Sequence, residues 1–120
     1  MYLKDKENQL YLIDSGACVS CIPPRKEDLK HKSTGNLRAA NGTPITSYGT
    51  RVIELNFNTG RKIKQIFEIA DVNEPILGIH FLKDHYIVLN FGTCLATDTV
   101  TGINYNTVYL LLSEILILEI

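Results

Sequence analysis

The chain has 120 residues, of which 45% are hydrophobic and 21% charged, and its formal net charge at pH 7 is -1. This length and composition predict one soluble globular domain and argue against a disordered chain. Because the sequence has no excess of Lys and Arg, it lacks the basic surface that a nucleic-acid partner requires.

The N-terminus and the cysteines indicate where the protein works. Charged side chains already occur within residues 1–6, so this segment is not the apolar part of a secretory signal. Three cysteines, an odd number, favour free thiols in a reducing compartment. We therefore expect an intracellular, cytoplasmic protein. The longest apolar stretch, residues 108–118, is too short for a membrane span and contains Glu114, so no membrane is expected as a partner.

The first part of the chain predicts a β-hairpin. Residues 2–5 and 10–13 have the composition of strands, and residues 6–9 are polar enough for the turn between them. The second strand leads directly to Asp14. Val19 and Ile22 resume an apolar pattern, which ends at Pro23 and Pro24, and the polar residues 25–35 predict a surface loop.

The remaining elements are mostly strands. Asn41-Gly42 predicts a tight hairpin over residues 37–45, because both residue types tolerate positive φ. Alternating patterns predict two long antiparallel strands over 46–58 and 63–70. Residues 76–78 form a short apolar run, and 79–85 have helical spacing with Ile79 and Leu82 on the apolar side. Residues 86–91 and 94–98 predict two further strands.

Asp14-Ser15-Gly16 follows the apolar strand of residues 10–13 and places a carboxylate at the rim of the core. Taken alone, such an Asp is most simply an Asx turn that closes a strand. Two other elements change this interpretation, namely the Asn-Gly hairpin and the apolar run that ends at Gly78.

Together these elements resemble the retropepsin family of aspartic proteases, and most closely the proteases of long-terminal-repeat retrotransposons of the gypsy type. The residues that carry the resemblance are 12–17 with Ser20, Ile22 and Pro23, 39–45 with Tyr48 and Gly49, and 76–78 with Phe81 and Leu82. The resemblance implies an all-β fold, a closed acid-protease barrel with one short helix and one lobe per chain. The domain would span residues 1–102. Residues 103–120 are not part of the resemblance, and we expect them to form a C-terminal strand or an apolar tail.

The resemblance also implies roles for individual residues. Asp14 would be the general acid and base, Ser15 would bond across a twofold axis, and the Gly16 carbonyl would accept a substrate N–H. Residues 39–45 would be a flap that closes over the substrate, and Gly78 would have a structural role in bracing the Asp14 loop. The predicted substrate-binding residues are Ala17, Ala39, Ala40, Asn41, Gly42, Thr43, Ile45, Ile76 and Leu77.

The chemistry explains why a second copy is needed. Hydrolysis of a peptide bond by water needs one ionised and one protonated carboxyl at the same pH, and two carboxyls held close together provide this, as in the aspartic proteases. The chain contains a single Asp-Ser-Gly, so we expect a C2 homodimer. The expected activity is an aspartic endopeptidase that cleaves extended segments, such as those of a retroelement polyprotein, without a metal or other cofactor. The alternative is a non-catalytic, domesticated or decayed domain that dimerises or binds peptides.

Some residues depart from the family pattern or allow another function. Cys18 and Ile79 stand where many relatives carry Asp and Arg that form a salt bridge. Cys18 and Cys21 form a C-x-x-C, which could indicate a redox or zinc site, but without a second pair at finger spacing we favour thiols lining a β-core. We expect His80 and His85 near the helix surface, and Arg61, Lys62 and Lys64 in a solvated turn.

Overall fold

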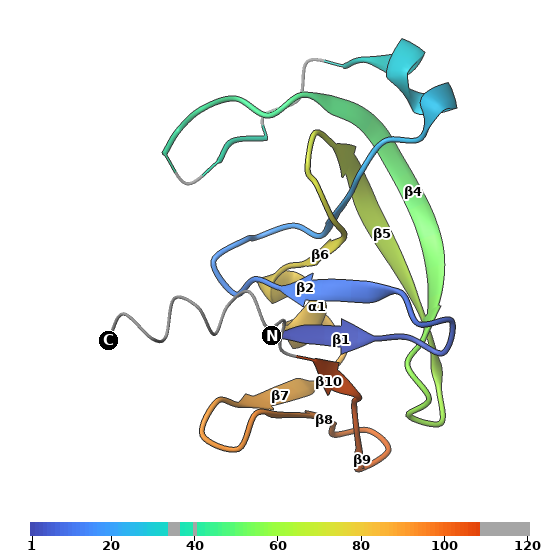
Figure 1. Ribbon diagram of the computed structural model, residues 1–120, viewed down its shortest axis with the longest axis vertical. Helices are drawn as coiled ribbons and strands as arrows, with labels where there is room; N and C mark the ends of the chain where they lie inside the picture. The colour runs from blue at the N-terminus through green and yellow to red at the C-terminus, as the bar shows by residue number, and fades with distance from the viewer. Residues whose placement is uncertain (34–36, 40, 109–120) are drawn as a thin grey trace.

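The computed structural model describes residues 1–33, 37–39 and 41–108 as two β-sheets with two short helices (Figure 1). The elements in chain order are β1 (Tyr2–Lys4), β2 (Leu10–Ile13), β3 (Cys21–Ile22), the 3₁₀ helix η1 (Lys26–His31), β4 (Ser47–Asn56), β5 (Lys62–Ala70), β6 (Ile76–Leu77), α1 (Ile79–Asp84), β7 (Ile87–Asn90), β8 (Leu95–Asp98), β9 (Ile103–Asn104) and β10 (Thr107–Val108). Neither helix in this part of the chain is long and apolar enough to cross a membrane. The expected all-β class with one short α-helix is confirmed.

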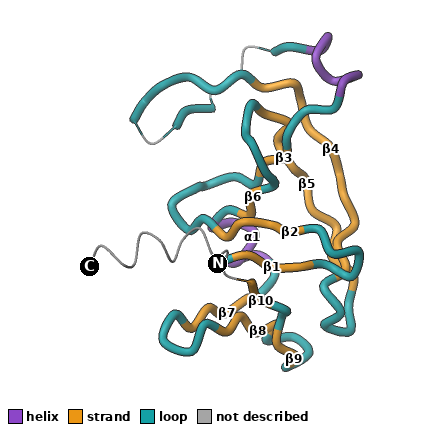
Figure 2. The backbone as a smooth tube through the Cα atoms, in the orientation of Figure 1, coloured by secondary structure: helices purple, strands orange, loops and turns teal. Residues whose placement is uncertain are grey.

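The larger sheet has seven strands in the order β10-β1-β2-β6-β3-β5-β4, and the smaller has three in the order β7-β8-β9. Most pairs are antiparallel, but β2 pairs in parallel with β6, and β3 with β5. The closed barrel was not a correct prediction, because over the described residues both sheets keep two open edges. The smaller sheet lies on the opposite side of the molecule from the loop that contains residues 37–45 (Figure 2).

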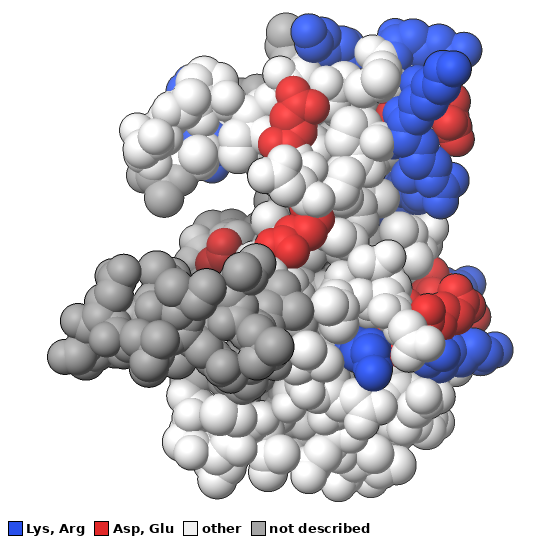
Figure 3. All heavy atoms as spheres, in the orientation of Figure 1, with Lys and Arg blue, Asp and Glu red and all other residues white. Residues whose placement is uncertain are grey.

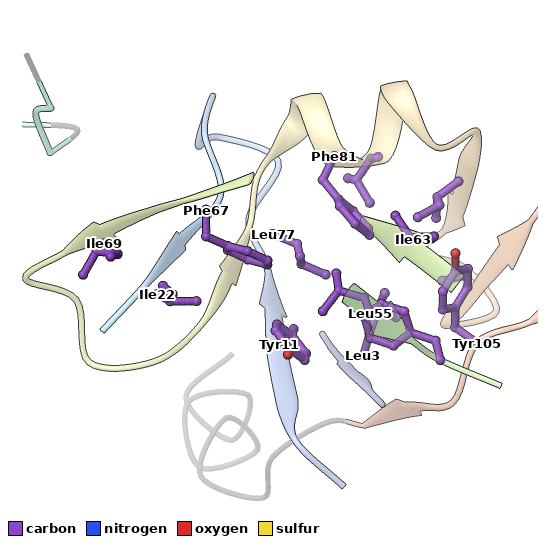
Figure 4. Close-up of a cluster of buried hydrophobic side chains, with 14 of the residues drawn as sticks. Leu3, Tyr11, Ile22, Leu55, Ile63, Phe67, Ile69, Leu77, Phe81 and Tyr105 are labelled. Carbon is purple, nitrogen blue, oxygen red and sulfur yellow. The ribbon is translucent and has the colours of Figure 1, made fainter. Parts of the chain in front are cut away.

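The β4–β5 hairpin forms one wall of the core. Its strands pair from Thr50↔Glu68 to Asn56↔Lys62, which confirms the two long antiparallel strands. Alternate residues face inward, so Leu55 and Phe67 are buried while Val52 and Ile66 are largely exposed. The inward residues pack with side chains from both ends of the chain, including Leu3 and Tyr105 (Figure 4).

The short segment β6 and the helix α1 carry the chain across this core. Leu77 is fully buried and points into the cluster beside Phe67 and Tyr11 (Figure 4). Phe81 and Leu82 of α1 are buried, whereas Ile79, which was expected on the apolar side of the helix, is 40% exposed. The helix therefore anchors the segment that follows β6.

Two charged segments differ from their predictions. Residues 26–31 form η1 rather than a loop, because buried Asp28 accepts a hydrogen bond from the Arg25 backbone N–H at 2.7 Å and pairs with Arg51 at 2.6 Å. Arg61 does not lie in a solvated turn, since its Nε is 2.6 Å from the fully buried carboxylate of Asp98. Asp28 and Asp98 therefore each form an ion pair with an Arg that is distant in the sequence.

The chain beyond residue 102 contributes to both sheets. β9 pairs with β8, and β10 pairs with β1 through Tyr2↔Val108 and Leu3↔Thr107. Tyr105 lies between them and is only 3% exposed. Residues 103–108 are thus part of the folded unit, and the rest of the predicted apolar tail lies outside the described residues.

Candidate active site

The backbone of Asp14 is held between two strands. β2 ends at Ile13, whose N–H donates to the Met1 carbonyl at 3.0 Å. The next N–H, that of Asp14, donates to the Leu77 carbonyl at the end of β6 at 3.0 Å. The Asp14 carbonyl in turn accepts from the Ala17 N–H at 3.0 Å. Three bonds therefore fix the position from which the Asp14 side chain projects.

The Asp14 carboxylate is half-buried, and one of its oxygens is engaged by the local turn. Oδ1 accepts from the Gly16 N–H at 3.0 Å, as in an Asx turn. A Cβ on residue 16 would lie 3.3 Å from the same oxygen, so a side chain there would crowd the carboxylate. The two interpretations of Asp14 are compatible, because the turn holds one oxygen and orients the carboxyl group that it presents.

A second set of contacts joins the loop after Asp14 to the segment after β6. The Gly78 N–H donates to the Ser20 hydroxyl at 3.0 Å, and the Ile79 N–H donates to the Ala17 carbonyl at 2.7 Å. Ser20 is 4% exposed, and its own carbonyl accepts from the Glu68 N–H of β5 at 2.9 Å. Ser20 therefore ties three segments together.

Gly78 fits this junction because it has no side chain. A Cβ there would lie 2.7 Å from the Val19 carbonyl oxygen and 2.8 Å from that of Ala17. These atoms belong to the backbone and cannot rotate away. The predicted structural residue thus lies against the loop that it was expected to support.

The predicted Asn-Gly hairpin is present. The Ile45 N–H donates to the Leu37 carbonyl and the Ala39 N–H to the Thr43 carbonyl, both at 2.9 Å. Gly42 has φ +84°, while the Asn41 side chain accepts from the Thr43 N–H at 3.0 Å. The hairpin stands out from the sheet on the side where β2 and β6 end, with a hollow beneath it (Figures 1 and 3).

The Asp14 loop and this hairpin form two walls of one cleft, which has a volume of about 640 Å³. Val72 and Ile76 complete the lining between them. Apart from Asp14 and Arg38, its lining residues are uncharged. The described part of the cleft is therefore an apolar groove with a carboxylate at one wall and a guanidinium at the other.

The structure brings together about half of the predicted site residues. Those that line the cleft are Asp14, Gly16, Ala17, Ala39, Ile45 and Ile76. Ser15 and the hairpin-tip residues Asn41, Gly42 and Thr43 are exposed and are not part of this lining, and Ala40 lies outside the described residues. Leu77, predicted to bind substrate, is instead buried in the core and meets Asp14 through its carbonyl.

The lining also contains residues that were not predicted, namely Cys18, Val19, Cys21, Leu37, Arg38 and Val72. Strand register would have identified Cys21, because it is the cross-strand partner of Ile76 and such partners share a face of the sheet. The other residues are close to predicted ones in the chain, so their positions depend on how the loops turn.

The two cleft cysteines differ in environment. Cys18 is exposed, whereas Cys21 is buried, and both are free thiols. Burial, with a smaller effect of Glu68, raises the pKa of Cys21 to about 11. Within residues 1–33, 37–39 and 41–108, His, Cys, Asp and Glu side chains form no cluster that could hold a metal ion. Both cysteines line the groove.

The comparisons with known proteins identify the fold. No protein-family model matches the chain, and no curated protein matches it. The crystal structure of the retroviral protease-like domain of Ddi1 from Leishmania major is similar, with a TM-score of 0.65 at 18% sequence identity over 91% of this chain and 94% of that chain. The chain therefore has a retropepsin-like fold.

Proposed function

We propose that this protein is an aspartic endopeptidase that acts as a C2 homodimer and cleaves peptide bonds in extended segments, such as those of a retroelement polyprotein. Each copy contributes one Asp14 to a shared pair of carboxyls. The observation that carries the proposal is the position of Asp14, which lies at a fixed strand end, has one oxygen bonded to the Gly16 N–H and lines an apolar cleft. The retropepsin-like fold supports the same reaction class.

The reaction needs two carboxyls in different protonation states. Two carboxyls a few Å apart cannot both ionise readily, so at mildly acidic pH the pair shares one proton. The ionised Asp14 takes a proton from water as the water oxygen bonds to the substrate carbonyl carbon. The protonated Asp14 of the other copy gives its proton to the carbonyl oxygen. The C–N bond of the tetrahedral intermediate then breaks, and the leaving amine takes the proton that the first Asp14 gained from water. A hydroxyl of the intermediate gives its proton to the other Asp14, so the acid product forms and the pair again shares one proton.

The loop around Asp14 is suited to positioning this pair. Ser15 is exposed next to Asp14, where it can bond to the second copy, and Gly16 leaves its backbone open to a peptide. Gly78 and Ser20 hold the loop from the core side, because the Gly78 N–H bonds to the Ser20 hydroxyl. Errors of about 1 Å in the position of a reacting group are costly in rate, so these supports would matter for catalysis.

The hairpin and the groove would bind the peptide. An extended peptide can be held by backbone hydrogen bonds while alternate side chains enter apolar subsites. Ile45, Val72 and Ile76 supply apolar lining on this copy. The hairpin of residues 37–45 would close over the substrate and exclude water, which is a common role of small mobile hairpins in enzymes.

Peptide-library cleavage between about pH 4 and pH 7 tests the proposal, since paired carboxyls favour mildly acidic conditions. We expect the wild-type chain to cleave and Asp14→Asn to be inactive. A statine-type inhibitor, whose hydroxyl mimics the tetrahedral intermediate, should also stop cleavage. Asp84→Asn is the matched control, because it removes a carboxylate of the same type from the exposed end of α1.

Three outcomes separate the hypotheses. The endopeptidase is supported if Asp14→Asn and the inhibitor both abolish cleavage while the Asp84→Asn protein still cleaves. Cleavage that persists in Asp14→Asn refutes it. A stable dimer that binds peptides but cleaves none would favour the alternative, a non-catalytic retropepsin-like binding domain.

A further inference from the structure

Arg38 is the only basic residue among the described residues that line the Asp14 cleft. The remaining lining is apolar or uncharged, apart from Asp14 itself. Arg38 lies on the first arm of the hairpin and pairs with Pro44 of the second arm. The cleft therefore has a fixed polarity, with its negative group on the Asp14 loop and its positive group on the hairpin.

The guanidinium of Arg38 is oriented but not neutralised. Its Nη1 donates to the Gly42 carbonyl at 3.0 Å, which ties the side chain to its own hairpin. The ion pairs of residues 1–33, 37–39 and 41–108 are Arg51–Asp28, Arg61–Asp98 and Lys62–Glu54, so Arg38 has no carboxylate partner in this part of the chain. A guanidinium has five N–H donors, and one is used by Gly42.

We propose that Arg38 is a specificity-determining residue, which selects peptide substrates with an acidic side chain near the scissile bond. This inference rests on the proposed endopeptidase function. An exposed guanidinium favours a carboxylate through charge and paired hydrogen bonds. Next to Asp14 the same carboxylate would be repelled, so the preference belongs to the subsite beneath the hairpin and not to the residues that form the scissile bond.

Symmetry makes the inference more specific. In a C2 dimer each copy supplies one Arg38, and the two guanidinium groups are related by the axis that passes between the two Asp14 residues. A bound peptide therefore meets one Arg38 on each side of the scissile bond. The acidic preference should appear at two positions, one on either side and equally distant from the bond.

The test compares peptides that carry Glu, Gln or Lys at one position at a time around a cleaved bond. We expect the wild-type chain to cleave the Glu peptides up to about fivefold faster at the two symmetric positions, which is the upper end for an exposed ion pair. Arg38→Gln should remove this difference, and Arg38→Lys should restore part of it. Arg38→Glu should reverse it in favour of Lys peptides, a result that loosening of the hairpin alone would not give.

The control is Lys64→Gln, which removes the same charge from an exposed position on β5 outside the cleft lining. It should keep the full Glu preference. The preference should also be larger at about 0.01 M than at about 1 M salt, because the screening length falls from roughly 30 to 3 Å. Arg38→Gln and Arg38→Glu profiles that match the wild type would overturn the inference.

Binding separates this inference from the endopeptidase proposal. The same peptides, labelled for fluorescence anisotropy, are titrated into Asp14→Asn with and without Arg38→Gln. Tighter binding of Glu peptides that depends on Arg38 supports the inference even if the wild-type chain cleaves nothing, in which case only the proposed endopeptidase fails. Equal binding of Glu and Gln peptides overturns the role of Arg38, whatever the cleavage assay gives.

Discussion

Substitution of Gly78 by Ala tests the support beneath the Asp14 loop. The added Cβ would lie 2.7 Å from the Val19 carbonyl oxygen, 2.8 Å from the Ala17 carbonyl oxygen and 2.9 Å from the Val19 carbonyl carbon. Real Cβ atoms do not approach other atoms so closely, and none of the three can move without shifting the backbone of the loop. The segment after β6 and the loop after Asp14 must therefore separate.

The expected loss follows from the size of this clash. Overpacking a filled site costs about 1–3 kcal/mol, and the bond between the Gly78 N–H and the Ser20 hydroxyl is weakened at the same time. For a chain of this length a loss of about 2 kcal/mol lowers Tm by roughly 6–12 °C. Peptide cleavage should fall further than stability alone explains, because the displaced residues flank Asp14.

Thermal denaturation followed by circular dichroism measures the first effect, and cleavage well below Tm measures the second. Gly92→Ala is the control, because Gly92 meets only the Asn90 side chain, at 3.3 Å, and has no positive φ. We expect its Tm to stay close to that of the wild type. A Gly78→Ala protein with unchanged Tm and cleavage would refute the idea that Gly78 holds the loop by close backbone contact.

Three further predictions concern groups around the site and in the core. Ser20→Ala leaves the buried Gly78 N–H without its acceptor and should lower the free energy of unfolding by about 1–3 kcal/mol; denaturant unfolding measures this, and an unchanged value would contradict it. Burial of Asp98 acts to raise its pKa, but hydrogen bonds from Arg61 and Thr59 outweigh burial, and the pKa is lowered. The ionised Asp98 therefore stabilises the fold at pH values above the unfolded-state pKa of about 3.9, and this stabilisation is lost as the pH falls through the lower pKa of the folded state. Asp98→Asn leaves Arg61 unpaired and should cost about 3 kcal/mol at neutral pH, and the Tm difference from the wild type should shrink toward about pH 3; a constant difference would contradict this. A thiol reagent at about pH 8 should label exposed Cys18 and Cys94 quickly and Cys21 only after denaturation, because the pKa of Cys21 is raised to about 11; fast labelling of all three would show that Cys21 is accessible.

The parts of the fold that were predicted depend on signals close together in the chain. The Asn-Gly hairpin, the alternating strands β4 and β5 and the helix after Gly78 can each be identified from fewer than about twenty residues. The sequence predicted that Gly78 lies beside Asp14 only through the family resemblance, in which the Asp-Ser-Gly segment, the Asn-Gly hairpin and the apolar run that ends at Gly78 follow one another in this order. The backbone bond from Asp14 to Leu77 then places them side by side, as expected.

The parts that were missed depend on partners far apart in the chain. Asp28 forms an ion pair with Arg51, 23 residues away, and Arg61 with Asp98, 37 residues away. The hydrogen bond between Ser20 and Gly78 joins residues 58 apart. The hydrophobic pattern of the sequence cannot predict which of these polar groups contact each other, because each acidic residue has several basic residues that could pair with it. The pairing of β10 with β1 is of the same kind, since it joins the two ends of the described chain.

The central claim is that one active site needs the Asp14 of two copies, and mixing tests it most directly. Wild-type chain and Asp14→Asn, carrying different tags, are refolded together in equal amounts, and cleavage is compared with the same total amount of wild type. If each site needs two intact Asp14 residues, only the wild-type homodimers cleave, and activity falls to about one quarter. A mixture with Asp84→Asn should keep full activity. Activity of about one half in a mixture whose two tags co-purify would mean that each chain works alone, which would contradict the account.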